Sequence, residues 1–170
     1  MTLHWIVGAA IVAQFALGWW MLEVPKDPPG ARAGWFNLHK SIGITLAAFV
    51  VFRLLWRMRH APPPLPGALP AAQRFAAAWT HRALYGCMLA MPLTGYLGSS
   101  FSGYPIKYFG MALPHWGWSW PAAKSLMSGV HWAAACLLGA LIALHVAAAL
   151  WHALRRDGLF ARIWPQWRPS

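Results

Sequence analysis

Four long apolar runs dominate the sequence, and each is about as long as a helix needs to be to cross a lipid bilayer, roughly 20 residues. Of the 170 residues, 59% are hydrophobic and only 10% are charged, which is far from the mix of a soluble domain. A soluble bundle would show polar positions about every 3.6 residues, and these runs barely do. The sequence therefore predicts an all-α, integral membrane four-helix bundle that forms a single domain over residues 1–170.

Loop-forming segments separate the runs and set the expected helix limits. The expected helices cover about residues 3–22, 38–57, 82–100 and 129–154. A proline-rich loop is expected over about 60–73, and a long aromatic loop over about 101–127 with a short surface helix in it. Pro92 falls inside the third helix, where neighbouring helices can satisfy the freed backbone groups. We therefore expect a kink at that proline and no break.

The basic residues indicate how the helices are oriented. Lys and Arg number 14 against 3 Asp and Glu, and they lie at the ends of the apolar runs, so an orientation signal is favoured and a nucleic acid partner is not. Nine of them lie in and beside the second connection or in the C-terminal tail, and five lie in and beside the first and third connections. The positive-inside rule then places the second connection and both termini in the cytoplasm.

The last apolar run contains three histidines, which hydrocarbon does not accommodate without a reason. Ionisable side chains within a membrane are rare and mark functional sites by default. His131 and His145 lie on one helix face, about 21 Å apart along the axis. In the predicted orientation His4 shares the inner depth of His145, and His39 shares the outer depth of His131. The sequence thus predicts two histidine pairs, one near each membrane surface.

Two pairs of imidazoles suit two metal centres with two protein ligands each. Zinc normally takes four protein ligands, or three and a water, and no acidic residue lies near these histidines. A porphyrin would fill the four remaining positions around each metal ion. Two bis-histidine haems b, held between the helices, are therefore the economical explanation, and iron with both axial positions filled favours electron transfer over oxygen chemistry.

Other residues near these pairs carry weaker signals. Gly8 and Gly43 each follow a histidine by four residues and share its helix face, where a glycine would leave room for a flat macrocycle. The alternative is that small residues simply let membrane helices pack closely. His152 lies about 10 Å closer to the cytoplasm than His145, and could replace it as a ligand or lie near a quinone or proton path. His81 is expected to open the third helix as a solvated or capping residue, with a role near a haem edge left open.

Several motifs resemble those of the bacterial cytochrome b561 family, the four-helix dihaem membrane cytochromes, and the resemblance covers essentially the whole chain. The matching stretches are LHW, QFALGWWM, NLHKSIG, RLLWR, APPPLP, LAMPLTG, SGYPIKYFG and ALHVAAALWH. The resemblance implies a bacterial inner-membrane protein surrounded by lipid. It also implies two haems b, which at the matching positions are carried by His4, His39, His131 and His145.

The resemblance further implies one-electron transfer between a donor or acceptor at the outer face and the quinone pool. One member passes electrons from superoxide to ubiquinone, and a chain that did the same would be an oxidoreductase. Others look like electron carriers, or like haem-binding anchor subunits of a dehydrogenase or hydrogenase that dock a redox partner protein. A haem-free transporter, the remaining alternative, is disfavoured because intramembrane acids and inverted repeats are lacking.

Basic residues near the surfaces are candidates for binding anions. Superoxide would be attracted by a basic outer funnel, and haem propionates would need donors near both surfaces. The outer candidates are Lys40, Lys107 and Lys124, and the inner candidates are Arg57, Arg82, Arg155 and Arg156. Interface anchoring explains most of these residues without any ligand.

The first run begins close to the start of the sequence. Family members usually carry some ten residues, including Arg or Tyr, before the LHW motif, whereas three residues precede His4 here. A helix that starts at Met1 leaves His4 near a fraying end. The inner haem is then expected to be the less secure of the two.

Overall fold

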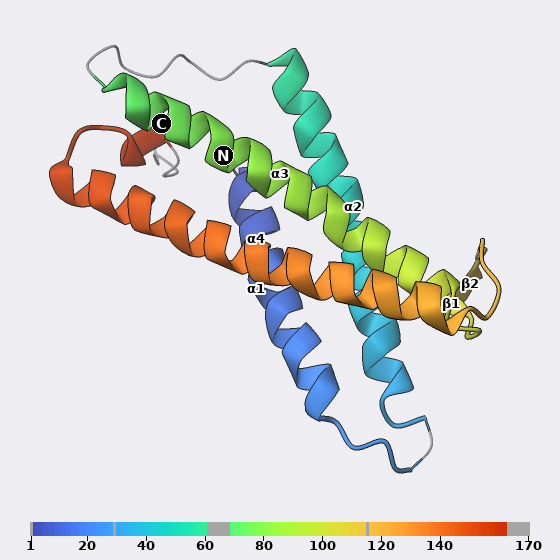
Figure 1. Ribbon diagram of the computed structural model, residues 1–170. Coiled ribbons are helices and arrows are strands. Elements are labelled where there is room, and N and C mark those ends of the chain that lie inside the picture. The colour runs from blue at the N-terminus through green and yellow to red at the C-terminus, as the bar shows by residue number, and fades with distance from the viewer. Residues whose placement is uncertain (1, 29, 61–68, 115, 163–170) are drawn as a thin grey trace, which may run out of the picture.

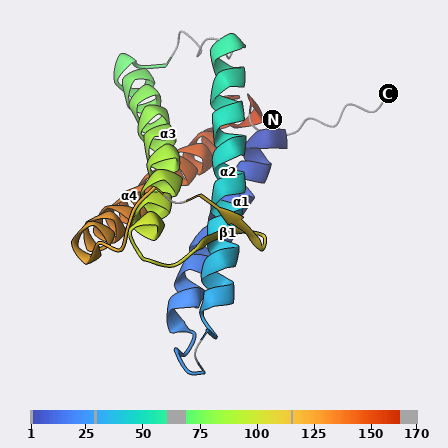
Figure 2. The same ribbon diagram turned by 90° about the vertical axis from the view of Figure 1, so that its right-hand side faces the viewer.

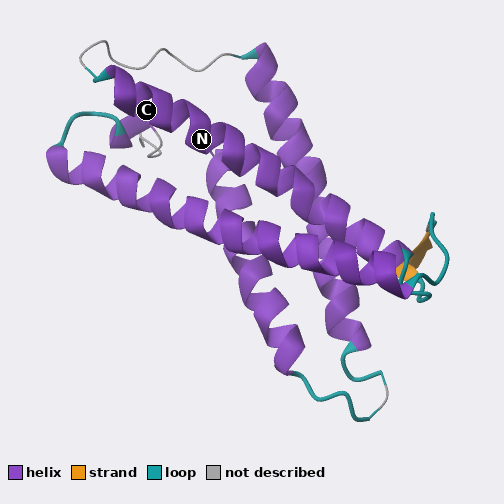
Figure 3. Ribbon diagram, viewed as in Figure 1, coloured by secondary structure: helices purple, strands orange, loops and turns teal. Residues whose placement is uncertain are grey.

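Four helices make up most of the computed structural model, which describes residues 2–28, 30–60, 69–114 and 116–162. The helices are α1 (Thr2–Glu23), α2 (Ala33–Arg59), α3 (Ala71–Ser100) and α4 (Pro121–Arg155), and the short elements are β1 (Ile106–Tyr108), β2 (Met111–Leu113) and the 3-10 turn η1 (Phe160–Arg162) (Figure 1, Figure 3). Most of the expected proline-rich loop, 61–68, and His115 in the third connection lie outside the described residues.

Three of the helices, α1, α2 and α4, are long and apolar enough to cross a membrane. This confirms the predicted helical membrane protein. Helix α3 has 30 residues, so it is long enough, but Gln73, Arg74 and Arg82 make its first half more polar than the other three. The helix continues through Pro92, so no break occurs there.

Two helices begin well before the limits that the sequence predicts. Helix α3 starts at Ala71 and not near residue 82, because the polar-looking stretch AAQRFAAAWT consists largely of strong helix formers. Helix α4 starts at Pro121 and not near residue 129. Proline suits the first helical position, where its fixed φ is helical and its missing N–H is not needed. The predicted loop over 101–127 is therefore wrong in its last part.

The helices pack as two pairs, α1 with α2 and α3 with α4, and the pairs meet where α2 packs on α3. The two pairs cross steeply in Figure 1, and Figure 2 shows α4 running across the direction of α1 and α2. Within the described residues, α4 packs closely on neither α1 nor α2. The core is correspondingly small for helices of this length, and it consists of Val7, Ile11, Val50, Leu84, Cys87 and Leu138.

The predicted surface helix in the third connection is absent from the described residues, and a β-hairpin takes its place. Strand β1 pairs antiparallel with β2, and glycines and prolines punctuate the segment too often for a helix. Phe109 and Gly110 have φ of 45° and 94°, as a two-residue turn with both central residues at positive φ requires. The backbone N–H of Phe109 donates to Ser41 Oγ at 2.9 Å, and Ile106 is buried. The hairpin is thereby docked on α2, close to His39.

The bundle has two ends that differ in what they contain. The terminal side holds the starts of α1 and α3 and the ends of α2 and α4, and the hairpin side holds the opposite ends and the β-hairpin (Figure 1).

Candidate functional site

Four of the predicted site histidines meet in two pairs. On the hairpin side, the ring centres of His39 in α2 and His131 in α4 are 6.4 Å apart. On the terminal side, those of His4 in α1 and His145 in α4 are 6.1 Å apart. These are the pairs that helix depth predicts. Each pair joins two helices whose backbones do not pack closely on each other in the described ranges.

The ring separations suit one metal ion between each pair. Metal–nitrogen bonds of about 2.0–2.1 Å on opposite sides of one ion put two imidazole centres roughly 6.3 Å apart, given about 1.1 Å from ring nitrogen to ring centre. The observed separations are 6.1 and 6.4 Å. The described residues offer no group of three or more His, Cys, Asp or Glu that could hold an ion. The donor set therefore fits a metal whose other ligands come from a macrocycle.

Helix α3 fixes the tautomer of His131. Its Nδ1 lies 3.0 Å from the carbonyl of Met91 and 3.1 Å from Thr94 Oγ1. The Thr94 hydroxyl itself donates to the carbonyl of Ala90 at 2.7 Å, so its oxygen is left to accept. His131 therefore carries its proton on Nδ1 and keeps a lone pair on Nε2. This is the arrangement by which a carbonyl partner orients a metal-binding histidine.

Two glycines that the sequence analysis did not single out touch the hairpin-side imidazoles. A Cβ on Gly18 would lie 3.4 Å from Cε1 of His39, and one on Gly95 would lie 3.3 Å from Cε1 of His131. Both rings therefore lie directly over the backbone of a neighbouring helix. Gln14 adds to this side, because its Nε2 donates to the carbonyl of His39 at 2.9 Å. In the sequence, these three residues are recognisable only as small or polar residues at the depth of His39 and His131.

The two predicted clearance glycines have different surroundings. A Cβ on Gly8 would meet nothing within 4 Å, so Gly8 borders open space one turn from His4, as clearance for a flat group requires. A Cβ on Gly43 would lie 3.1 Å from Nε2 of Gln14, so Gly43 makes room for that amide. Whether either glycine contacts a haem stays a prediction.

A third imidazole joins the terminal-side pair. The rings of His81 and His145 are 5.3 Å apart. His81 lies well inside α3 and does not open it, because α3 begins at Ala71, so the predicted capping role is wrong. Arg53 of α2 also reaches this cluster, where its Nη2 donates to Nδ1 of His4 at 2.9 Å.

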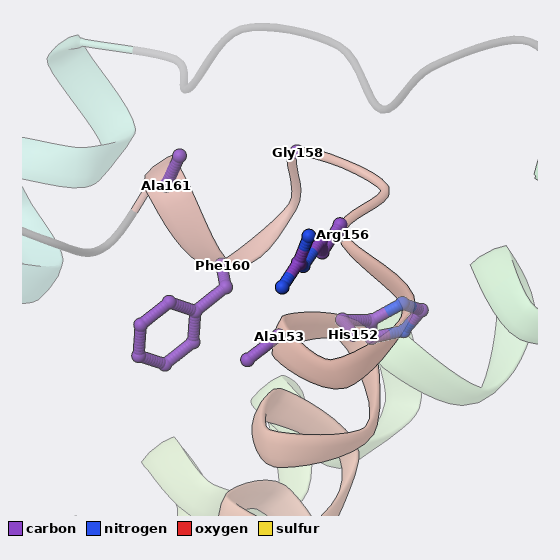
Figure 4. Close-up of a pocket in the computed structure, with 6 residues that line it drawn as sticks. All are labelled: His152, Ala153, Arg156, Gly158, Phe160 and Ala161. Atoms are coloured by element: carbon purple, nitrogen blue, oxygen red, sulfur yellow. The ribbon is translucent and has the colours of Figure 1, made fainter.

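His152 lies apart from these clusters. Its Nδ1 donates to Oδ2 of Asp157 at 2.5 Å, and this hydrogen bond holds the pKa of the Asp157 carboxyl below its usual value. His152 lies in the last turn of α4, and Asp157 follows the end of the helix. There, His152 and Arg156 line an open pocket of about 260 Å³ (Figure 4). His145 and not His152 therefore faces His4.

The sequence matches that of a known family along nearly its whole length. A model of the prokaryotic cytochrome b561 family matches residues 1–166. The chain belongs to this family. Members of the family are prokaryotic membrane cytochromes, so membership implies haem b binding and supports electron transfer within a membrane.

Curated relatives agree with this membership. The chain is similar to cytochrome b561 homolog 2 of Escherichia coli, with 41% identity over 112 residues, covering 63% of this chain and 56% of the relative. It is 28% identical to cytochrome b561 homolog 1 of the same organism, over 96% of this chain and 93% of the relative. It is 25% identical to a probable superoxide oxidase of Yersinia pestis, over 98% of this chain and 93% of the relative.

Proposed function

We propose that this cytochrome carries electrons across the membrane through two haems b, one between His39 and His131 and the other between His4 and His145. The observation that carries the proposal is the presence of two imidazole pairs at two depths of the bundle, each with a ring separation that would suit one metal ion held between the rings. The small core supports it, because helices this long would bury more residues if they packed only on one another.

The protein's own groups orient the ligands and close the metal to other chemistry. Haem b supplies one-electron chemistry when bound. His131 is held with Nε2 as the donor atom by Met91 and Thr94, and Gly18 and Gly95 let the hairpin-side rings lie against helix backbones. With two histidines holding it at each site, the haem would supply electron transfer and not oxygen chemistry. The arrangement suits a relay of electrons between partners bound at the two ends.

For the partners, we assign the electron donor to the hairpin side and a quinone to the terminal side. The positive-inside bias supports cytoplasmic termini, which makes the hairpin side the outer face. One relative is called a probable superoxide oxidase, and superoxide, an anion, would be attracted to the basic side chains on this side. The terminal side, with its cluster of His4, His81 and His145, is where we place electron delivery to ubiquinone.

Haem content tests the ligand assignment. The purified protein reduced with dithionite should show low-spin b-type bands and about two haems per chain. His131→Ala and His145→Ala should each lose one haem, whereas His152→Ala, the matched control on the same helix, should keep both. A folded preparation without haem contradicts the proposal, and so does His152→Ala losing a haem as His145→Ala does.

Reduction kinetics test the partners. Superoxide added anaerobically to the lone purified chain should reduce its haems, and a ubiquinone analogue should reoxidise them. Reduction only in the presence of a second protein would instead favour the anchor-subunit alternative.

A further inference from the structure

Two arginines of α2 lie beside one tyrosine of α3 on the terminal side. The guanidinium carbons of Arg53 and Arg57, one helical turn apart, are 5.8 and 5.9 Å from the ring centre of Tyr85. All three side chains are partly buried between the helices. The cluster therefore concentrates two positive charges at one place within an apolar bundle.

No carboxylate among the described residues compensates these charges. Its acidic side chains are Glu23, Asp27 and Asp157. The first two lie in or beside the α1–α2 connection, on the hairpin side, and Asp157 pairs with His152. Across the ranges that the structure describes, neither arginine takes part in an ion pair. Charges within a membrane protein are costly without a partner, so the cluster calls for an anion from elsewhere.

Within the part of the chain that the structure describes, the hydroxyl of Tyr85 also lacks a hydrogen-bond partner. Its oxygen is buried and makes no hydrogen bond, whereas buried hydroxyls almost always find one. A hydroxyl can donate to an oxyanion, as the neighbouring guanidinium groups do. A buried hydroxyl without a partner, next to two guanidinium groups that form no ion pair within the described ranges, is the chemistry of a site for a carboxylate or phosphate.

The contact between Arg53 and His4 shows which anion fits. Arg53 donates to Nδ1 of His4, so the neutral imidazole carries its proton on Nε2. A metal bound at Nε2 requires that proton to move to Nδ1, and an N–H at Nδ1 cannot accept from Arg53. If neutral His4 held a metal at Nε2, Arg53 would lose this acceptor and would be left beside Arg57 and Tyr85. A group that brings a metal to His4 and a carboxylate to Arg53 satisfies both residues at once.

We propose that Arg53, Arg57 and Tyr85 form an anion site for a carboxylate of the haem held by His4 and His145, and that Arg53 exchanges His4 for this carboxylate when the haem binds. The site rests on the proposed function, since it assumes that His4 and His145 hold a haem. Its depth favours this source over a lipid headgroup, because Arg53 lies about 9 Å from the end of α2 at Arg59.

The test uses single-haem variants to isolate the site. In His131→Ala, which should retain only the terminal-side haem, Arg53→Gln should weaken haem retention by about tenfold or more, the loss expected for a charge-assisted hydrogen bond. It should also lower the midpoint potential of that haem, because a positive charge nearby favours the reduced form. Arg53→Lys should restore part of both, and Arg59→Gln, at the exposed end of α2, should change neither. In His145→Ala, which should keep only the hairpin-side haem, Arg53→Gln should have no effect.

Esterified haem separates recognition of the carboxylate from general packing. The His131→Ala protein, stripped and reloaded in detergent, should bind haem about tenfold more tightly than haem dimethyl ester. This preference should shrink in Arg57→Gln and in Tyr85→Phe. Equal binding of the two pigments overturns the proposal while leaving the histidine ligands intact, and loss of no haem in His131→Ala contradicts the proposed function instead. Native mass spectrometry that finds an anionic phospholipid held by Arg53 in the loaded protein also overturns it.

Discussion

Replacing Gly95 with alanine should disturb the hairpin-side haem with little effect on overall stability. The new Cβ would lie 3.3 Å from Cε1 and 3.4 Å from Nδ1 of His131, whereas carbon contacts settle at about 3.5–4.0 Å. The ring must therefore move by a few tenths of an ångström. Its hydrogen bonds to Met91 and Thr94, now 3.0 and 3.1 Å, would stretch towards the limit of useful geometry.

The substitution should change haem affinity much more than the free energy of unfolding. Removing glycine from a helix interior gains up to about 1 kcal/mol, and an off-rotamer ring costs about 0.5–1.5 kcal/mol, so the free energy of unfolding should change little. Disturbing the groups that orient a metal ligand typically costs 10–100-fold in metal affinity. We therefore expect haem retention at the His39–His131 site to fall by about tenfold.

The assay compares three alanine variants for haem content, low-spin spectrum and midpoint potential in detergent, alongside thermal unfolding. Gly86→Ala, where a Cβ meets nothing within 4 Å, is the matched control on the same helix, and Gly18→Ala, with a contact of 3.4 Å to His39, should give a milder effect. Gly95→Ala behaving like Gly86→Ala in all three haem measurements would refute the reasoning.

Two further predictions concern the ends of the bundle. Ser41→Ala removes the acceptor for the Phe109 N–H, a loss of about 1 kcal/mol, so hydrogen exchange at Phe109 should quicken about fivefold while exchange in the helices stays unchanged. Ser125→Ala is its control, and unchanged exchange in Ser41→Ala would show that this bond does not hold the hairpin. At the other end, the hydrogen bond from His152 lowers the pKa of Asp157. The small contribution of this hydrogen bond to the stability of the fold should be present at pH values above the ordinary carboxyl pKa. It should be lost as the pH falls through the lowered pKa of Asp157. Carboxyl NMR should find this pKa raised in His152→Ala, and an unmoved pKa would rule out the pairing.

The histidine pairs could be predicted because depth along a helix depends only on residue count and chain direction. Fourteen residues separate His131 from His145, so the partners had to lie at two levels whatever the details of packing. The helix starts could not be predicted in the same way. The ten helical residues before His81 were not predicted, because polar residues interrupt the apolar pattern there. Their helix propensity is nevertheless high, and propensity together with packing makes the segment helical.

The residues that surround the histidine pairs could not be predicted from the sequence either. In the sequence, Arg53 only adds to the number of basic residues that indicate the orientation of the helices. Nothing in the sequence indicates that its guanidinium group contacts His4. Gly18 and Gly95 sit on helices other than those of the rings they touch, and a helix-face argument relates only residues of the same helix.

The two-pair packing also bears on how the two halves of the chain are joined. Helices α1 and α2 pack as one pair, and α3 and α4 as another. His4 and His39 belong to the first pair of helices, and His131 and His145 to the second, so neither pair holds both histidines of a proposed haem site. A haem bound as proposed would tie the N-terminal half to the C-terminal half and would stabilise the assembled state by mass action. The supply of haem in the cell would then determine how much of the chain reaches its finished form, and unloaded chains would be the ones exposed to proteolysis.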